Sequence, residues 1–242
     1  MHVDLFLTSV SLDTAELENK SVVVIDVLRA TTSICAALKA GARSVIPTAG
    51  PGEAGEMRAK LEADTVILAG ERNGVKIDNF DLGNSPTEFT PDTVGGKNLI
   101  MTTTNGTLAL RRASRGKRVL AAALVNVSRV AEAVCTLDRD VVMICSGREG
   151  HFSIEDTLCG GMLIHQLTAK HKVPAELNDA ASLALLLYRT NRSAIRQAVA
   201  QGEHGKFLQS IGFGPDVDIA TEVDAMSVLP ILRDGRLVAD EN

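Results

Sequence analysis

Acidic, basic and hydroxyl side chains follow directly after one strongly apolar segment of the chain. Residues 22–25 are Val, Val, Val and Ile, and Asp26, Arg29 and the hydroxyl residues 31–33 come next. A carboxylate can bind a hard cation such as Mg²⁺, whereas an arginine beside the start of a helix suits an anion such as phosphate. A helix cap next to a surface arginine would show the same pattern, so a functional interpretation requires that the pattern recur.

The pattern recurs three times along the chain. Polar segments 70–86, 102–107 and 146–156 each follow a short apolar segment of the kind that forms a buried strand. Ligands of parallel α/β sheets bind at the carboxyl ends of the strands. We therefore expect these three segments to meet the segment that begins at Asp26 and to form one site with it.

The four segments are rich in carboxylates and arginines, and His151 is the one histidine that they contain. This composition argues against a Ser-His-Asp relay and against a zinc site. Carboxylates with hydroxyl- and glycine-rich turns suit Mg²⁺ and phosphate, which together indicate metal-assisted phosphoryl transfer to water. The sequence has no GxxxxGK[ST] loop, no Asp-x-Asp after a strand and no GxGxxG, so it lacks the common nucleotide, haloacid-dehalogenase and dinucleotide signatures.

Short apolar segments alternate with segments of helical periodicity. Strands are predicted at 3–7, 22–26, 44–46, 65–69, 98–101, 118–124 and 140–145, and helices at 34–40, 51–61, 108–113, 126–134, 153–171 and, with an interruption near 190–193, for some thirty residues from 177. The segments 228–232 and 236–238 flank an Asp-Gly pair and predict a terminal hairpin. This order predicts an α/β fold with a largely parallel sheet and helices on both faces.

The length, composition and charge limit the classes of protein to which the chain can belong. The chain has 242 residues, 45% of them hydrophobic, and a net charge of −5, which argues against broad binding to nucleic acid or to an anionic membrane. No signal peptide or membrane-spanning segment is apparent, so we expect a cytoplasmic protein. We expect a single domain over 1–242, in which the helical stretch 177–211 could form a lobe. The four widely spaced cysteines indicate reduced core residues.

Five segments in order resemble the motif series of the 2-phosphosulfolactate phosphatases, the ComB family of coenzyme M biosynthesis. They are VVVIDVLRATTSI, GERNGVKIDNFDLGNSP, TTTNGT, CSGREGHFSIED and VLPILRDGRL, and they span essentially the whole chain. The resemblance implies a three-layer α/β/α fold and a Mg²⁺-dependent hydrolase that converts 2-phospho-3-sulfolactate to 3-sulfolactate and phosphate. Such a substrate carries a phosphate, a sulfonate and a carboxylate, which would explain several arginines inside an acidic protein.

We assign roles to these residues as hypotheses. The predicted catalytic residues are Asp26, Arg29, Arg148 and Glu149, and the predicted metal ligands are Asp26, Glu71, Asp78 and Asp156, with the activation of water open among these carboxylates. The predicted substrate-binding residues are Thr31, Thr32, Arg72, Thr104, Asn105, Gly106, Thr107, Ser146 and Gly147, although capping is the alternative for at least one threonine. For Asp81 and Glu155 we prefer a role in holding arginines by salt bridges.

Two alternatives remain open at this stage. The same scaffold could hydrolyse another small phosphorylated organic acid, because the residues do not show that a sulfonate is recognised. A non-catalytic protein that binds a phosphorylated anion is the alternative of another class. A homodimer formed through a strand edge or through 183–187 is a further hypothesis.

Overall fold

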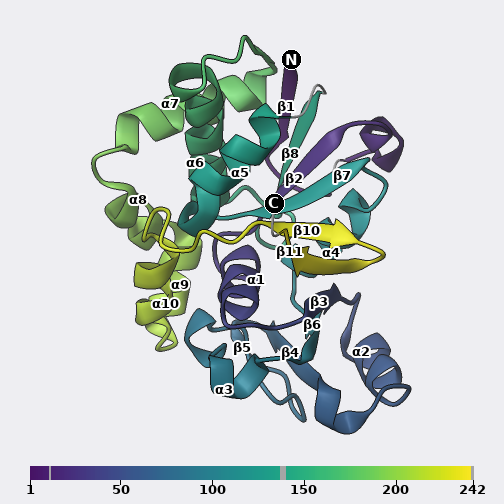
Figure 1. Ribbon diagram of the computed structural model, residues 1–242. Coiled ribbons are helices and arrows are strands. Elements are labelled where there is room, and N and C mark those ends of the chain that lie inside the picture. Colours follow the sequence, from purple (N-terminus) through teal and green to yellow (C-terminus); the bar gives the residue numbers. More distant parts are fainter. Residues whose placement is uncertain (11, 137–139, 241–242) are drawn as a thin grey trace.

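The computed structural model describes residues 1–10, 12–136 and 140–240. Within them, eleven strands form one mixed sheet in the order β5-β4-β6-β3-β11-β10-β7-β2-β8-β1-β9 (Figure 1). The strands are β1 (His2–Phe6), β2 (Ser21–Ile25), β3 (Ser44–Pro47), β4 (Val66–Arg72), β5 (Val75–Lys76), β6 (Asn98–Thr102), β7 (Arg118–Ala122), β8 (Val141–Cys145), β9 (Glu176–Leu177), β10 (Pro230–Arg233) and β11 (Arg236–Ala239). The predicted α/β fold with a largely parallel sheet is confirmed.

Helices flank this sheet. They are α1 (Ala30–Lys39), α2 (Pro51–Arg58), α3 (Pro91–Val94), α4 (Gly106–Ala113), α5 (Val127–Cys135), α6 (Ile154–His165), α7 (Asp179–Asn191), α8 (Ile195–Gln201), α9 (Glu203–Ser210) and α10 (Gly214–Ala220). A π-helical turn, Gln166–Lys170, prolongs α6. Helix α10 was not predicted, because the segment at Gly212–Pro215 reads as a simple break.

Strand β2 is buried along its whole length because it contacts a hydrophobic cluster on each face. Val23 belongs to the cluster that includes residues of α5 and α6. Val24, pointing the other way, belongs to the cluster that includes residues of α1 and α4. Successive side chains of a strand point to opposite faces, so the run of β-branched residues places β2 between two helical layers and fixes where its carboxyl end emerges.

The C-terminal hairpin lies inside the sheet rather than at its edge. Ile231 of β10 pairs with Leu120 of β7, and Leu237 of β11 pairs with Val45 of β3, both antiparallel. Asp234 and Gly235 both have positive φ, which is typical of the tight turn predicted from the Asp-Gly pair. The hairpin thereby joins the parallel strands on the β3 side to the parallel strands on the β7 side.

The start of α1 differs from the prediction. The helix begins at Ala30, so the hydroxyl residues 31–33 lie in its first turn and do not precede it. The carboxylate of Asp26 accepts the N–H of Ala30 at 3.0 Å. Asp26 therefore supplies the cap that was expected from the threonines, and the predicted end of the helix at Gly41, with φ of +90°, is confirmed.

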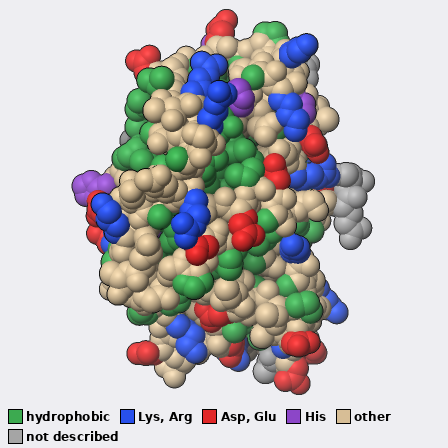
Figure 2. All heavy atoms as spheres, turned by 90° about the vertical axis from the view of Figure 1, so that its left-hand side faces the viewer, with side chains coloured by type: hydrophobic (Ala, Val, Ile, Leu, Met, Phe, Trp, Pro, Cys, Tyr) green, Lys and Arg blue, Asp and Glu red, His purple; other side chains and the backbone are tan. Residues whose placement is uncertain are grey.

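Helices α7 to α10 lie together along one side of the molecule (Figure 1). Leu183 and Leu186 of α7 are 49% and 61% exposed, and hydrophobic side chains lie among charged ones on this face (Figure 2). The separate lobe and the homodimer both stay predictions. Among the described residues, no helix has the length and apolar character that crossing a bilayer requires.

Candidate active site

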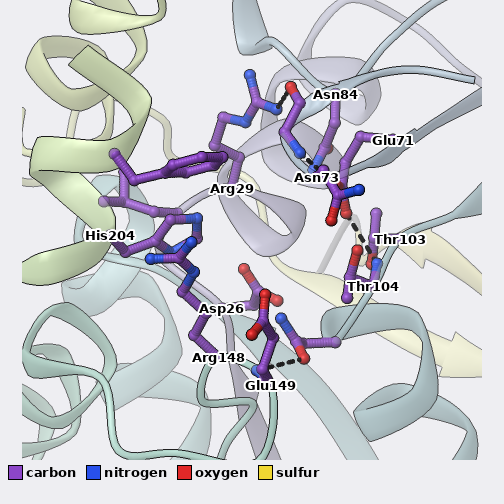
Figure 3. A pocket seen from close by; sticks show the side chains of 14 residues that line it. Asp26, Arg29, Glu71, Asn73, Asn84, Thr103, Thr104, Arg148, Glu149 and His204 are labelled. Carbon is purple, nitrogen blue, oxygen red and sulfur yellow. Dashed lines mark hydrogen bonds between the residues drawn. The ribbon is translucent and has the colours of Figure 1, made fainter. Parts of the chain in front are cut away.

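All four polar segments meet at a cavity of about 180 Å³ at the carboxyl ends of β2, β4, β6 and β8. The lining residues are Asp26, Leu28, Arg29, Glu71, Asn73, Gly74, Asn84, Thr103, Thr104, Asn105, Arg148, Glu149, His204 and Phe207. His204 and Arg148 lie on one side of the cavity, and Glu71 and Thr104 lie on the other (Figure 3). His204 and Phe207 lie on α9, which is far in the sequence from the predicted segments.

Asp26 lies at the base of this cavity and is 5% exposed. Burial raises the pKa of its carboxyl to about 6, against the lowering effects of hydrogen bonds from Ser146 and Ala30 and of the charge of His204, while the charge of Glu71 raises it further. Gly106 permits this arrangement, because a Cβ atom there would lie 2.5 Å from Asp26 Oδ2. The first turn of α4 can therefore approach the carboxylate closely.

Glu71 connects two loops of the cavity. Its Oε1 atom accepts the N–H of Thr104 at 2.8 Å, and its Oε2 atom accepts the N–H of Gly74 at 2.9 Å. Because side chains alternate along β4, Arg72 is turned away from Glu71; its guanidinium donates to the carbonyl oxygen of Glu71 and does not line the cavity. The structure therefore places the predicted metal ligand in the cavity and the predicted substrate arginine outside it.

Two arginines reach the cavity, and each lies over a phenylalanine ring. Arg29 stacks on Phe213 at 4.3 Å, and Arg148 stacks on Phe207 at 4.4 Å. Arg29 also donates to Gly74 O at 2.5 Å and forms an ion pair with Asp216. Arg148 contacts the carboxylate of Glu203 at 3.4 Å, but that carboxylate is 92% exposed, so Arg148 keeps more of its charge available to a ligand.

Two buried oxygen atoms in the cavity wall are left over by the hydrogen bonds of the described residues. Asn84 Oδ1 and Thr104 Oγ1 make no hydrogen bond within the described part of the chain. Buried polar atoms in proteins are nearly always hydrogen-bonded to protein or water. These oxygens are therefore available to a ligand, a metal ion or its water.

The described residues place fewer of the predicted Mg²⁺ ligands at the cavity than expected. Over residues 1–10, 12–136 and 140–240, no group of three or more His, Cys, Asp or Glu side chains is arranged to hold a metal. Mg²⁺ commonly takes one or two carboxylates and completes its shell with water and phosphate. Asp26 and Glu71 are the two carboxylates that would hold such an ion here, and the oxygens of Asn84 and Thr104 that have no partner among the described residues would add neutral donors.

The other two predicted metal ligands lie elsewhere. Asp78 is exposed and does not line the cavity. Asp156 is buried behind the wall, where its carboxylate accepts from Val27 N at 2.8 Å and Ser146 Oγ at 3.1 Å. Burial, and then the charges of Asp26 and Glu155, raise the pKa of Asp156 well above its usual value. Asp156 therefore holds the ends of β2 and β8 together.

Several predicted substrate-binding residues belong to the scaffold of the site. The Thr31 hydroxyl contacts the carbonyl oxygens of Asp26 and Ala122, both at 2.7 Å. The remaining side-chain hydroxyls bond to nearby backbone or carboxylate groups: Thr32 to Val27 O, Thr107 to Thr103 O, and Ser146 to Asp156. Capping and loop support thus account for these residues, and none of them lines the cavity.

The loop after β8 depends on a glycine. Gly147 has φ of +66°, and a Cβ atom there would lie 2.4 Å from the carbonyl oxygen of His151. This turn presents Arg148 and Glu149 to the cavity, and Asn105 fixes the second of them by accepting the Glu149 N–H at 3.1 Å. The structure brings the following predicted residues together at the cavity: Asp26, Arg29, Glu71, Thr104, Asn105, Arg148 and Glu149.

The prediction missed Asn73, Asn84, Thr103, His204 and Phe207. The two asparagines and Thr103 lie inside the predicted segments, so their polar type was the available signal. His204 and Phe207 lie on α9, and no local motif marks them. Glu155, expected to hold an arginine, contacts His204 instead, with Oε1 3.1 Å from Nδ1.

Comparison with known proteins gives one consistent answer over the full chain. A family model described as 2-phosphosulpholactate phosphatase matches residues 6–235. A protein of Caldanaerobacter subterraneus subsp. tengcongensis is 38% identical over 235 residues, which cover 97% of each chain. A protein of Clostridium beijerinckii is 36% identical over 240 residues, which cover 99% of this chain and 100% of the relative. Both relatives carry the name "Probable 2-phosphosulfolactate phosphatase".

Proposed function

The chain belongs to the 2-phosphosulfolactate phosphatase family, and from this we propose that it is a Mg²⁺-dependent hydrolase of 2-phospho-3-sulfolactate. The products would be 3-sulfolactate and phosphate. The observation that carries the proposal is the single cavity in which the carboxylates of Asp26 and Glu71 lie with the guanidinium groups of Arg29 and Arg148. This combination suits a cation and a polyanionic ester at the same place.

The arginines bind the anionic groups of the substrate. Arginine has five N–H donors and keeps its proton in proteins. Arg29 uses part of its donor set on Asp216 and Gly74, whereas Arg148 has one long contact to an exposed carboxylate. We therefore assign the stronger attraction for substrate to Arg148 and a more rigid, orienting contact to Arg29.

The carboxylates divide between two tasks. Asp26 and Glu71 would hold Mg²⁺, which when bound neutralises charge on the phosphoryl oxygens. Glu149, an exposed side chain at the cavity, takes the proton from the attacking water. Asn105 orients the Glu149 backbone, and Thr104 and Asn84 offer oxygens to groups inside the cavity.

One observation favours a second candidate substrate. Arg72, predicted to bind the substrate, lies outside the cavity, so two of the three predicted arginines remain for three anionic groups. A phosphorylated acid with fewer anionic groups, such as phosphoglycolate or phosphoglycerate, would also match this charge. The reaction class is the same in both cases.

The test measures phosphate release from 2-phospho-3-sulfolactate, phosphoglycolate and phosphoglycerate, with Mg²⁺ and with EDTA. The proposal expects turnover of the sulfonate ester that requires the metal and collapses in Asp26→Asn. Cleavage of another ester in its place would retain the reaction and replace the substrate. Tight binding without cleavage of any ester by folded protein would instead favour the binding protein.

A further inference from the structure

A histidine and a glutamate form a pair at one wall of the cavity. His204 is the second residue of α9 and Glu155 is the second residue of α6. His204 Nδ1 lies 3.1 Å from Glu155 Oε1, and the two side chains are 17% and 2% exposed. The contact between the two helix starts requires Gly202, because a Cβ atom there would lie 2.6 Å from Ile154 Cγ2.

The pair orients the imidazole toward the cavity. Because Nδ1 faces Glu155, the other ring nitrogen, Nε2, remains for the cavity that His204 lines. Among the described residues, the hydrogen bond of the His204 ring is the one that Nδ1 makes with Glu155. A carboxylate behind one ring nitrogen fixes the tautomer and the ring orientation and stabilises the imidazolium.

Glu155 has no other cation beside it in the described part of the chain. An ionised carboxylate that is 98% buried without a partner would be costly, so the pairing explains why a glutamate can occupy this position. His204 also lies close enough to Asp26 for its charge to lower the pKa of that carboxyl. The imidazole thus belongs to the same electrostatic site as the proposed metal ligands.

The reaction needs a proton donor that the arginines cannot supply. The leaving group of a phosphorylated 2-hydroxy acid is the alkoxide of a secondary alcohol, which leaves poorly unless it is protonated. Arg29 and Arg148 keep their protons, and Asp26 and Glu71 are occupied as carboxylates in the proposed function. Histidine is the side chain whose proton transfer is suited to neutral pH.

We propose that His204 is the general acid of the reaction and that Glu155 is its positioning residue. The inference rests on the proposed phosphatase function. As the P–O bond to the alcohol breaks, the Nε2 proton passes to the bridging oxygen, while the oxygen of water forms the new bond to phosphorus. The water proton passes to Glu149 and then to solvent, from which His204 regains the proton it gave.

The experiment compares two substrates that differ in the leaving atom. One is 2-phospho-3-sulfolactate, and the other is its analogue with sulfur at the bridging position, because a thiolate leaves without protonation. We expect His204→Gln to lower kcat on the oxygen ester by about 10²- to 10⁴-fold and on the sulfur ester by less than about tenfold. Equal losses on both esters, or no loss on the oxygen ester, would overturn the inference.

A heavy-oxygen isotope effect at the bridging atom of the natural ester gives an independent answer. It should be larger in His204→Gln than in wild type, because negative charge then accumulates on the leaving oxygen. An unchanged isotope effect would mean that His204 only supports the fold. Failure of wild-type protein to cleave either ester would instead reject the proposed function.

The chain offers a matched control for the pair. His2 and Glu176 make a similar contact at 3.0 Å, but their side chains are 61% and 80% exposed at the edge of the sheet. His2→Gln should leave both rates unchanged. Glu155→Gln, which keeps the size of the side chain and one acceptor oxygen, should reproduce the selective loss on the oxygen ester to a smaller extent.

Discussion

Arg29 Nη1 lies 2.7 Å from Asp216 Oδ2, in an ion pair whose side chains are 2% and 3% exposed. The two residues are 187 positions apart in the chain. Asp216 also accepts the hydroxyl of Ser85 at 2.6 Å. This pair therefore ties the helical C-terminal region to the carboxyl end of β2 and to the segment that follows β5.

Asp216→Asn should destabilise the protein strongly. The change leaves the Arg29 charge buried without its partner, which costs about 3–5 kcal/mol. Asp218→Asn, two residues away on α10, breaks an ion pair with Arg196 whose side chains are 67% and 52% exposed, and should cost about 0–1 kcal/mol. Urea unfolding measures the free energy of unfolding of both variants. Similar losses would contradict the larger effect that we expect for the buried ion pair.

Gly106→Ala should reduce activity more than stability. The added methyl group would lie 2.5 Å from both Asp26 Oδ2 and Ala30 Cβ, so the carboxylate must shift, and a displacement of about 1 Å can cost about a hundredfold in rate. Gly52→Ala is the control, because a Cβ atom there meets nothing within 4 Å. The two variants are compared by steady-state turnover and thermal unfolding; full activity of Gly106→Ala would show that the site tolerates the shift.

Glu71→Gln should raise the Mg²⁺ concentration for half-maximal activity, and Asp26→Asn, which we expect to be inactive, should weaken the Mg²⁺ binding measured by calorimetry. We expect at least about a tenfold rise, the loss that even an outer partner of a metal ligand causes. Asp78→Asn should behave as wild type, because Asp78 is exposed and outside the cavity. Mg²⁺ titration of activity and calorimetry measures the change, and an effect of Asp78 equal to that of Glu71 would restore the wider ligand set.

Thr31→Val should lower the stability of the protein, whereas Thr104→Val should lower its activity. Valine at 31 removes the hydroxyl that accepts from Asp26 N and donates to Ala122 O, and loss of these buried hydrogen bonds costs about 1–3 kcal/mol of stability. Valine at 104 removes a buried oxygen that has no hydrogen-bond partner in the described part of the chain, so kcat/KM should fall roughly tenfold to a hundredfold if that oxygen contacts a charged ligand group. Kinetics and urea unfolding on both variants separate the two roles, and an active, normally binding Thr104→Val would remove Thr104 from the site.

Cys135 should be the first thiol to react with a disulfide reagent in the folded protein. It is half-buried, whereas Cys35, Cys145 and Cys159 are fully buried. Burial raises the pKa of all four thiols, by the smallest margin at Cys135, where the charge of Glu132 adds to the effect. Thiol titration before and after unfolding counts the reactive groups; rapid reaction of all four in folded protein would contradict the packed core.

The strands and the position of the site could be predicted because each rests on local information. A run such as 22–25 is apolar at every position, which identifies a strand buried on both faces, and the polar residues that follow must emerge at its end. The same logic located Glu71, Thr104 and Arg148. β2 runs parallel to β8, and β4 runs parallel to β6. The three antiparallel pairings β7–β10, β10–β11 and β11–β3 reverse the strand direction between these two groups, so the meeting of all four strand ends at one cavity does not follow from a uniformly parallel sheet.

Contacts between distant segments could not be predicted in this way. His204 and Asp216 reach the site because α9 and α10 pack beside it, and the sequence around each resembles that of any amphipathic helix. The role of the threonines after Asp26 in substrate binding was overestimated, because a hydroxyl near a helix start can cap the helix, bind substrate or bond to a neighbouring strand. Thr31 takes the third option with Ala122 O, which depends on the position of β7.

Because β10 and β11 lie between β7 and β3, the sheet cannot be completed until the last strands of the chain have been synthesised. Val45 cannot find its partner Leu237, nor Leu120 its partner Ile231, until residues 230–239 have left the exit tunnel. Until then both halves of the sheet present open strand edges, which are prone to pairing with other chains. A nonsense mutation that removed these few residues would thus leave a nascent chain with most of its catalytic groups present and a strong tendency to aggregate.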